Sequence, residues 1–554
     1  MNKIYEQYGL KPYGAVPNER QMEWYGRKRT IFFHFGMNTF TGKEWGDGDE
    51  SPELFNPSEL SCEQWVKAIK DGGFTTAILT AKHHDGFCLW PSKYTEHSVK
   101  NSPYKNGQGD VVREFTDACA KYGIKAGIYL SPWDRHEPTW GKDEYNDYYV
   151  GQLTELLTNY GKIWECWWDG AGSTEAVYDW ERWANTVRSL QPDAVIFGSL
   201  GATPWVDVRW VGNEKGVAGK PCYATIDPHS LVVENTYELN HGKLGGERFI
   251  PAEVDVSIRP AWFYHAEQDN MVRSPENLVE LWFTSIGSNA GLLLNLPPDR
   301  RGLIHENDVE SIKRFNEIIT SILNSNLALD GEFTGESVDN SSVSSLISAR
   351  EFYVSGKTSF AFEVRLPEKR EINALAIGEC IELGHKVTSI KAIATLDGEK
   401  KLLFQREMIG HTLAERFATV KTDLIRVEIE ALDVPALKDF GLYRLDDYTV
   451  KAYAKDGRNI LGDSLVKIYK RENEIDVNLG GLIPFNRISL KNVGDVSFKI
   501  YVFNGTAFDL YADGKSQNGQ IEHTFDMVVD IAYRFKVVLD KPISNDMKIE
   551  AYLV

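Results

Sequence analysis

Between residue 30 and about residue 325, short apolar runs alternate with longer amphipathic runs. Continuous apolar runs are typical of strands buried in a parallel sheet, and amphipathic runs are typical of the helices that cover it. Seven or eight such pairs favour an α/β fold of the (β/α)8 TIM-barrel type over an open doubly wound sheet. No glycine-rich phosphate loop follows the first apolar run, which disfavours a nucleotide-binding sheet. The predicted strands lie within 30–37, 74–84, 124–134, 162–170, 194–200, 206–214, 252–265 and 291–299.

The composition changes near residue 330, where the polar stretch GEFTGESVDNSSVSSL has the character of a linker. From about 350 to 445 short alternating runs predict a β-sandwich, and a second all-β stretch follows from about 450. We therefore expect three domains: a catalytic barrel over 1–330, a β-sandwich over 331–448 and a small all-β domain over 449–554.

The chain is acidic, with 61 Lys and Arg against 80 Asp and Glu, a formal charge of −19. Such a surface repels phosphate groups, which argues against nucleic acid and anionic membranes as partners, and no apolar run is long enough to insert into a bilayer. The first residues hold no apolar leader, so we expect a cytoplasmic protein, or a secreted or periplasmic one whose leader has been removed. Six widely spaced cysteines without a CxxC pair predict neither a disulfide framework nor a zinc site.

Reactive side chains follow nearly every predicted strand. In a (β/α)8 barrel the carboxyl ends of the strands carry the chemistry. Carboxylates, imidazoles and indoles that converge there predict a pocket for a ligand rich in hydroxyl groups. These residues are His34, Glu44, Trp45, Lys82, His83, His84, Asp85, Tyr129, Trp133, Asp134, Trp167, Asp169, Glu214, Glu253, Arg259, Trp262 and Asn295.

Asp169 closes the aromatic segment WWDG at the end of one of these strands. Hydrolysis of a glycosidic bond needs two carboxyl groups, one ionised and one protonated. Asp-Gly is also a turn signal, so a purely structural aspartate is the alternative. Its position on the reactive face of the barrel favours a catalytic nucleophile.

His83-His84-Asp85 raises the question of a metal site. Neighbouring residues on a strand point to opposite faces, so the two imidazoles would chelate one ion poorly. The chain also lacks the HxH and HExxH spacings of metal sites. We favour neutral imidazoles that bond to sugar hydroxyls, and we expect no metal or other cofactor.

Several ordered segments, FFHFGMNTF, EWGDG, TAKHHDGFCLWPSKYT, GIYLSPWD and WWDGAG, resemble those of the α-L-fucosidases of glycoside hydrolase family 29. The resemblance covers roughly residues 20–325. It implies a barrel fold, a retaining two-step mechanism without a cofactor, and release of L-fucose from fucosylated oligosaccharides or glycoconjugates. It makes Asp169 the nucleophile. The residues that it assigns to fucose binding are His34, Glu44, Trp45, His83, His84, Tyr129 and Trp167.

The acid/base residue differs between two branches of that family. In the broad-specificity branch it would correspond to Glu253, and in the branch restricted to α-1,3/1,4-linked fucose to Glu214. The segments WVGNEKG and DVSIRPAWFYH resemble the restricted branch, so we favour Glu214 and Lewis-type branched glycans. Trp133, Arg259 and Trp262 complete the expected substrate-binding set. Phe40, Tyr129, Trp133 and Trp262 are equally candidates for an apolar wall against the C6 methyl group or for barrel core.

Four other functions stay open. The first two are a broad-specificity α-L-fucosidase and another retaining exo-glycosidase, such as a galactosidase. A carbohydrate-binding protein without catalysis is disfavoured by the intact carboxylates, and a metal-dependent hydrolase by the missing ligand spacings. The predicted β-sandwich resembles galactose-binding-like modules, but we expect it to brace the barrel rather than bind sugar.

Overall fold

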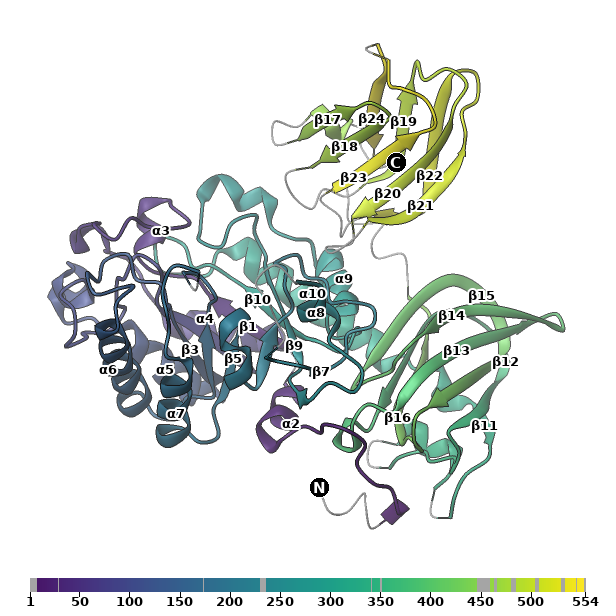
Figure 1. Cartoon of the computed structure of the whole chain (residues 1–554), viewed down its shortest axis with the longest axis horizontal. Coiled ribbons are helices and arrows are strands. Elements are labelled where there is room, and N and C mark those ends of the chain that lie inside the picture. Colours follow the sequence, from purple (N-terminus) through teal and green to yellow (C-terminus); the bar gives the residue numbers. More distant parts are fainter. Residues whose placement is uncertain are drawn as a thin grey trace. The chain divides into compact units, whose positions relative to one another are not determined.

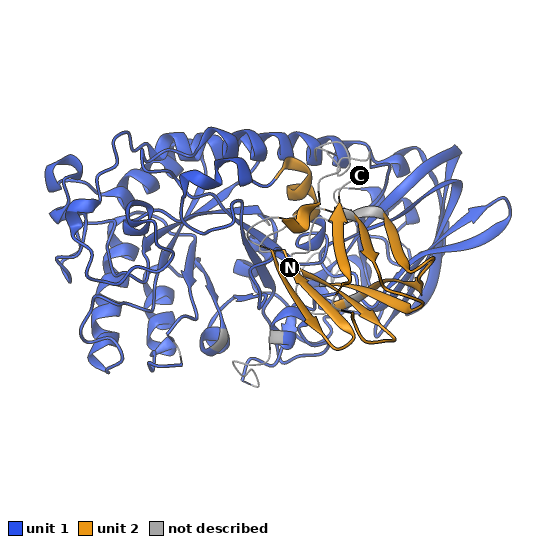
Figure 2. Ribbon diagram, turned by 90° about the horizontal axis from the view of Figure 1, so that it is seen from above, with its two compact units in different colours: residues 1–273, 282–445 blue, residues 274–281, 446–554 orange. Residues whose placement is uncertain are grey.

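The computed structural model describes residues 7–27, 29–172, 174–229, 236–339, 341–348, 351–445, 459–462, 466–479, 485–503, 508–529, 534–544 and 546–552. The chain separates into two compact units, residues 1–273 with 282–445 and residues 274–281 with 446–554 (Figure 2). The first unit contains a barrel and a six-stranded antiparallel sheet. The second contains two further antiparallel sheets.

Eight parallel strands form a closed barrel (Figure 1). Their order around the barrel is β1-β10-β9-β6-β5-β4-β3-β2. Each of the eight predicted segments contributes one strand, so the predicted TIM-barrel fold is confirmed. Seven of the eight strands consist entirely of buried residues or are buried after their first residue, as expected of a parallel sheet covered by helices. The strands are β1 (Arg29–Phe33), β2 (Thr76–Lys82), β3 (Lys125–Leu130), β4 (Glu165–Trp168), β5 (Val195–Gly198), β6 (Val208–Trp210), β9 (Ala252–Ser257) and β10 (Gly291–Asn295).

Helices lie between successive barrel strands and around the outside of the barrel (Figure 1). Helix α5 shows how the sequence sets their limits: the Asp110 side chain accepts a hydrogen bond from the Arg113 N–H, and Gly123 ends the helix at φ 74°. A two-stranded sheet, β7 (Thr225–Ile226) with β8 (Arg248–Phe249), lies outside the barrel. The helices are α2 (Glu19–Tyr25), α3 (Met37–Thr41), α4 (Cys62–Asp71), α5 (Val111–Tyr122), α6 (Glu144–Asn159), α7 (Trp180–Leu190), α8 (Thr236–His241), α9 (Pro275–Thr284) and α10 (Glu306–Asn324).

The interior of the barrel is packed with side chains. Phe32, Tyr129, Trp167 and Phe197 belong to one buried cluster with Trp24 from α2. The indole of Trp24 occupies the space beside Gly291, where a Cβ atom would lie 2.4 Å from the ring. Trp24 thus fills the barrel interior near the amino end of β10, and the carboxyl ends of the strands are where barrels of this type carry their sites.

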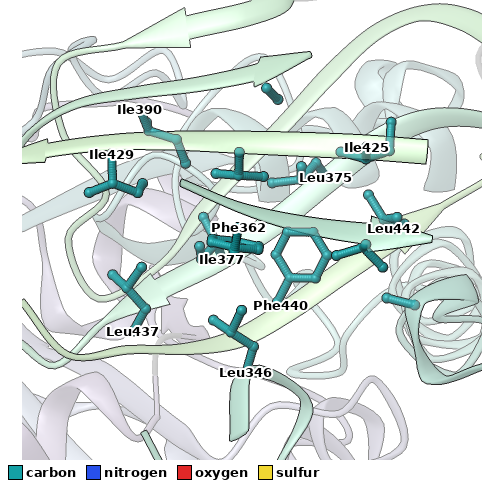
Figure 3. Close-up of a cluster of buried hydrophobic side chains, with 14 of the residues drawn as sticks. Leu346, Phe362, Leu375, Ile377, Ile390, Ile425, Ile429, Leu437, Phe440 and Leu442 are labelled. Carbon is teal, nitrogen blue, oxygen red and sulfur yellow. The ribbon is translucent and has the colours of Figure 1, made fainter. Parts of the chain in front are cut away.

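The described strands between residues 332 and 443 form the six-stranded sheet, in the order β11-β12-β15-β13-β14 with β16 also paired to β12. Register shifts divide the long strand β12 into one part paired with β11 and another paired with β16. Figure 3 shows the buried apolar core of this β-sandwich, which includes Phe362, Ile425 and Phe440. The strands are β11 (Glu332–Gly335), β12 (Ser359–Glu379), β13 (Val387–Leu396), β14 (Glu399–Arg406), β15 (Leu413–Ala431) and β16 (Leu437–Tyr443).

The second unit has sheets in the orders β17-β18-β23-β20-β21 and β22-β19-β24 around its own apolar core. The domain boundary expected at 448/449 lies outside the described residues. All six cysteines are buried free thiols, and none of the described helices is long and apolar enough to cross a membrane. The strands are β17 (Lys467–Arg471), β18 (Glu474–Asn478), β19 (Phe485–Lys491), β20 (Ser497–Phe503), β21 (Phe508–Lys515), β22 (Gln520–Val529), β23 (Arg534–Leu539) and β24 (Lys548–Tyr552).

Candidate active site

Asp169 follows β4 directly, and both of its carboxylate oxygens accept a hydrogen bond. The Tyr129 hydroxyl donates to Oδ2 at 3.1 Å, and the backbone N–H of Ala171 donates to Oδ1 at 2.8 Å. Its side chain is nevertheless 31% exposed. The carboxylate is therefore fixed in orientation and open on one side, as a nucleophile must be.

Glu214 stands in the loop after β6, and the indole Nε1 of Trp262 donates to its Oε2 at 3.2 Å. Burial raises the pKa of Glu214, the Trp262 hydrogen bond opposes that rise, and the negative charges of Asp169 and Glu44 add to it. These influences favour the protonated form. The carboxyls of Asp169 and Glu214 thus share a site but lie in different environments.

Glu44 joins the loop after α3 to the loop after β9. Its carboxylate accepts hydrogen bonds from the backbone N–H groups of Trp262 at 2.8 Å and Phe263 at 3.3 Å. His265 Nε2 lies 3.1 Å from the same carboxylate. Glu44 therefore holds in place the segment whose indole contacts Glu214.

The imidazole of His34 is neutral and its tautomer is fixed by Asn295. Burial lowers the pKa of His34 to about 3. Asn295 Nδ2 donates to the Trp262 carbonyl, so its Oδ1 faces His34 Nδ1, 2.9 Å away. Because this oxygen can only accept, Nδ1 carries the proton and Nε2 is left as an acceptor.

The tautomer of His84 is fixed by Ser131. Burial lowers its pKa, and the charge of Asp169 opposes this. Ser131 donates its only proton to the Trp133 carbonyl at 2.7 Å, so it accepts from His84 Nδ1, also at 2.7 Å. Nε2 of His84 is then an acceptor, 3.7 Å from Asp169 Oδ2.

His83 has the opposite tautomer. Burial lowers its pKa well below the ordinary value. Asn38 Nδ2 donates to the Glu44 carbonyl and lies 3.4 Å from His83 Nδ1, which therefore accepts. Nε2–H of His83 remains as a donor. With His34 and His84 the pocket offers two imidazole acceptors and one donor, a set suited to hydroxyl groups.

Aromatic rings line the same end of the barrel. Trp262 lies 5.0 Å from His34 and Trp133 lies 5.0 Å from His84, measured between ring centroids. Trp45 is 61% exposed and meets Trp133 edge to face at 5.5 Å. Trp167 is 6% exposed and stacks on Phe197 at 4.4 Å, so most of its ring belongs to the barrel core.

The α-L-fucosidase family model matches residues 7–320, more than half of the chain. The chain belongs to the α-L-fucosidases of glycoside hydrolase family 29. α-L-Fucosidase 1 of Arabidopsis thaliana is 37% identical to it over 491 residues, 84% of this chain and 94% of the relative. It is therefore a glycoside hydrolase.

Two solved structures carry the same fold. A family 29 glycoside hydrolase from an unknown rumen bacterium aligns with a TM-score of 0.74 and 30% identity, over 98% of this chain and all of that one. A family 29 fucosidase of Ruminococcus gnavus in complex with fucose aligns with a TM-score of 0.73 and 29% identity, over 79% of this chain and 96% of that one.

Two of the residues expected in the site of this fucosidase lie elsewhere. Glu253 is the second residue of β9, four residues before Ser257 at the carboxyl end, or about 13 Å away along the strand. It is buried and accepts a hydrogen bond from Trp24 at 3.2 Å. Glu253 therefore lies toward the closed end of the barrel, away from Asp169.

The structure also corrects the expectation that Arg259 contacts the sugar. Its side chain has no exposed surface. Its Nε donates to Asp308 at 3.0 Å and its Nη1 to Asp269 at 2.9 Å. The guanidinium therefore braces the segment after β9. Phe40, considered for an apolar wall, instead packs against Phe35 and Phe55.

Of the three residues that orient the imidazoles, Asn295 was expected at this end of the barrel as a polar strand end, without its role. Ser131 and Asn38 carry no local sequence signal, because their histidine partners lie in other segments of the chain. Among the described residues one group of three possible metal ligands occurs, Asp47, Asp49 and Glu50. Glu50 already accepts from two backbone N–H groups, and the Lys43 ammonium pairs with Asp47.

Proposed function

We propose that this fucosidase removes α-1,3/1,4-linked fucose from Lewis-type branched glycans by a retaining double displacement. The observation that carries the proposal is the pairing of Asp169 with Glu214 at the open end of the barrel. Two hydrogen bonds hold the Asp169 carboxylate in place, whereas burial raises the pKa of Glu214 and favours its protonated form.

In the first step a carboxylate oxygen of Asp169 attacks the anomeric carbon. The glycosidic C–O bond breaks, and Glu214 transfers its proton to the departing oxygen. The glycan leaves as an alcohol, and fucose remains bound to Asp169 as an ester. The neutral imidazoles of His34, His83 and His84 hold the sugar hydroxyls.

In the second step the ionised Glu214 takes a proton from a water molecule that attacks the anomeric carbon. The bond to Asp169 breaks, the carboxylate is regenerated and Glu214 is protonated again. Two inversions at one carbon release fucose with its original configuration.

The linkage preference rests on which glutamate acts as the acid/base. Glu214 hydrogen-bonds to Trp262 and is influenced by the charge of Asp169, whereas Glu253 is buried beside Trp24. This arrangement supports the branch in which the acid/base precedes the segment 252–264, the branch restricted to α-1,3/1,4 linkages.

The test is parallel incubation with Lewis a, Lewis x and H-type α-1,2-linked glycans, with the released sugar followed by proton NMR. We expect release of α-L-fucose as the first anomer from the Lewis glycans, and little from the H type. Comparable release from the H type would favour a broad-specificity fucosidase. The β anomer as the first product would rule out the retaining mechanism.

A further inference from the structure

A chain of hydrogen bonds from outside the pocket ends at the turn that carries Asp169. Trp140 Nε1 donates to the Tyr178 hydroxyl at 3.1 Å, and that hydroxyl donates to the carbonyl of Ala171 at 3.1 Å. The N–H of Ala171 in turn donates to Asp169 Oδ1. Ala171 therefore links Tyr178, and through it Trp140, to the carboxylate of Asp169.

The direction of each bond in this chain is fixed. An indole nitrogen can only donate, so Trp140 uses an acceptor lone pair of the Tyr178 oxygen. A backbone carbonyl can only accept, so the single hydroxyl proton of Tyr178 points at Ala171. Only this orientation of the Tyr178 hydroxyl satisfies both Trp140 and the Ala171 carbonyl.

Packing around the turn is equally restrictive. Gly172 has φ 76°, and a Cβ atom there would lie 2.5 Å from the Tyr178 oxygen and 2.9 Å from the Trp140 ring. Tyr178 itself is 7% exposed and its ring lies 5.3 Å from that of Trp183. The turn at Gly172 therefore packs directly against Tyr178, whose ring also packs against Trp183.

The backbone of Glu137 connects Trp140 to a buried ion pair. Lys82 and Asp134, both with no exposed side-chain surface, meet at 2.7 Å. Asp134 Oδ1 also accepts from the N–H of Glu137, whose carbonyl accepts from the N–H of Trp140 at 3.0 Å. The polar residues Lys82 and Asp134 at the ends of β2 and β3 thus support a loop rather than line the pocket.

We propose that Tyr178 is a positioning residue for the nucleophile. Its hydroxyl, supported by Trp140, fixes the Ala171 carbonyl and with it the backbone of the turn, so that the N–H on the other side of the Ala171 Cα holds Asp169 in the orientation needed for attack. This inference rests on the proposed role of Asp169. Because the Tyr178 hydroxyl bonds to Trp140 and to the Ala171 carbonyl, we expect it to act on the rate of the chemical steps and not on sugar binding.

The first test is Tyr178→Phe, with Tyr145→Phe as the matched control. Tyr145 belongs to the same aromatic cluster, and its hydroxyl also donates to a backbone carbonyl, that of Pro132 at 2.8 Å. We expect Tyr178→Phe to lower kcat for an aryl α-L-fucoside roughly tenfold, with the inhibition constant of L-fucose unchanged. Tyr145→Phe should keep kcat within about twofold. Equal losses in both variants would overturn the proposal.

The second test asks whether Tyr178 acts through Asp169. In an Asp169→Ala background, azide can attack the anomeric carbon in place of the carboxylate while the aryl oxide leaves. Tyr178→Phe should then change the azide-rescued rate by less than about twofold, because the group that it positions is gone. A tenfold loss in this background would overturn the proposal. Wild-type turnover by Asp169→Ala alone would instead remove Asp169 as the nucleophile.

Discussion

The indole N–H of Trp262 donates a hydrogen bond to Glu214 Oε2 at 3.2 Å. The backbone N–H of the same tryptophan is bound by Glu44, and its carbonyl accepts from Asn295. A single residue after β9 therefore connects the proposed acid/base to the groups that orient the pocket.

This contact predicts a shift of the pH profile. A donor to a carboxylate stabilises the ionised form, so Trp262→Phe should raise the pKa of Glu214 further. Since Glu214 must be protonated for the first step, the alkaline limb of kcat/KM should move to higher pH. Trp24→Phe, which removes an indole donor to Glu253 at the closed end of the barrel, should leave that limb in place. If the alkaline limb of kcat/KM stays in place in Trp262→Phe, the Trp262 hydrogen bond does not tune the pKa of Glu214.

The assignment of Arg259 as a brace predicts paired effects with Asp308. Removing one partner of a buried ion pair costs about 3–5 kcal/mol of stability, because the other charge is left unpaired. Arg259→Leu and Asp308→Leu should therefore both lower the free energy of unfolding, measured with denaturant, and should weaken fucose inhibition to a similar extent. Loss of fucose binding in Arg259→Leu alone would restore Arg259 as a direct sugar ligand.

Glu165 predicts a dependence of stability on pH. Burial raises its pKa from 4.5 to about 8, with Arg27 opposing and Asp207 adding to the rise, and Oε1 has no hydrogen-bond partner. Between these pH values the folded state holds a proton that the unfolded chain has released, so stability falls as pH rises from about 4.5 to about 8.

Glu165→Gln removes this titration, and its Tm should exceed that of the wild type by a margin that grows from pH 5 to pH 8. Glu181→Gln, at an exposed position on α7, provides the control and should track the wild type. A constant margin across this pH range would show that Glu165 does not titrate on folding.

The barrel was predictable from sequence because its strands are buried on both faces and read as apolar runs. The position of Asp169 at the carboxyl end of a strand was predictable for the same reason, since it closes one of these runs. The distinction between Glu214 and Glu253 depends on where β9 begins: with Ala252 as its first residue, Glu253 lies near the amino end, away from the reactive face. The direction of the strand predicted from the sequence would therefore have been enough to place Glu253 away from the reactive face.

The roles of Arg259, Tyr178 and Trp140 could not be predicted from the sequence around them. Arg259 follows a strand end, as a ligand would, but its partner Asp308 is 49 residues further along the chain. Tyr178 and Trp140 lie in loops without any periodic pattern, and their contact with the Asp169 turn exists only after β3 and β4 pair. Residues that act through another residue leave no local signal in the chain.

The central claim is that Asp169 forms a covalent ester with fucose. A 2-deoxy-2-fluoro-α-L-fucosyl fluoride slows both steps while its fluoride leaves readily, so the ester should accumulate. Mass spectrometry of the intact protein and its peptides should then find one fluorofucosyl group, attached to Asp169. A label on a different carboxylate, or rapid turnover of the reagent without any labelled protein, would contradict the account.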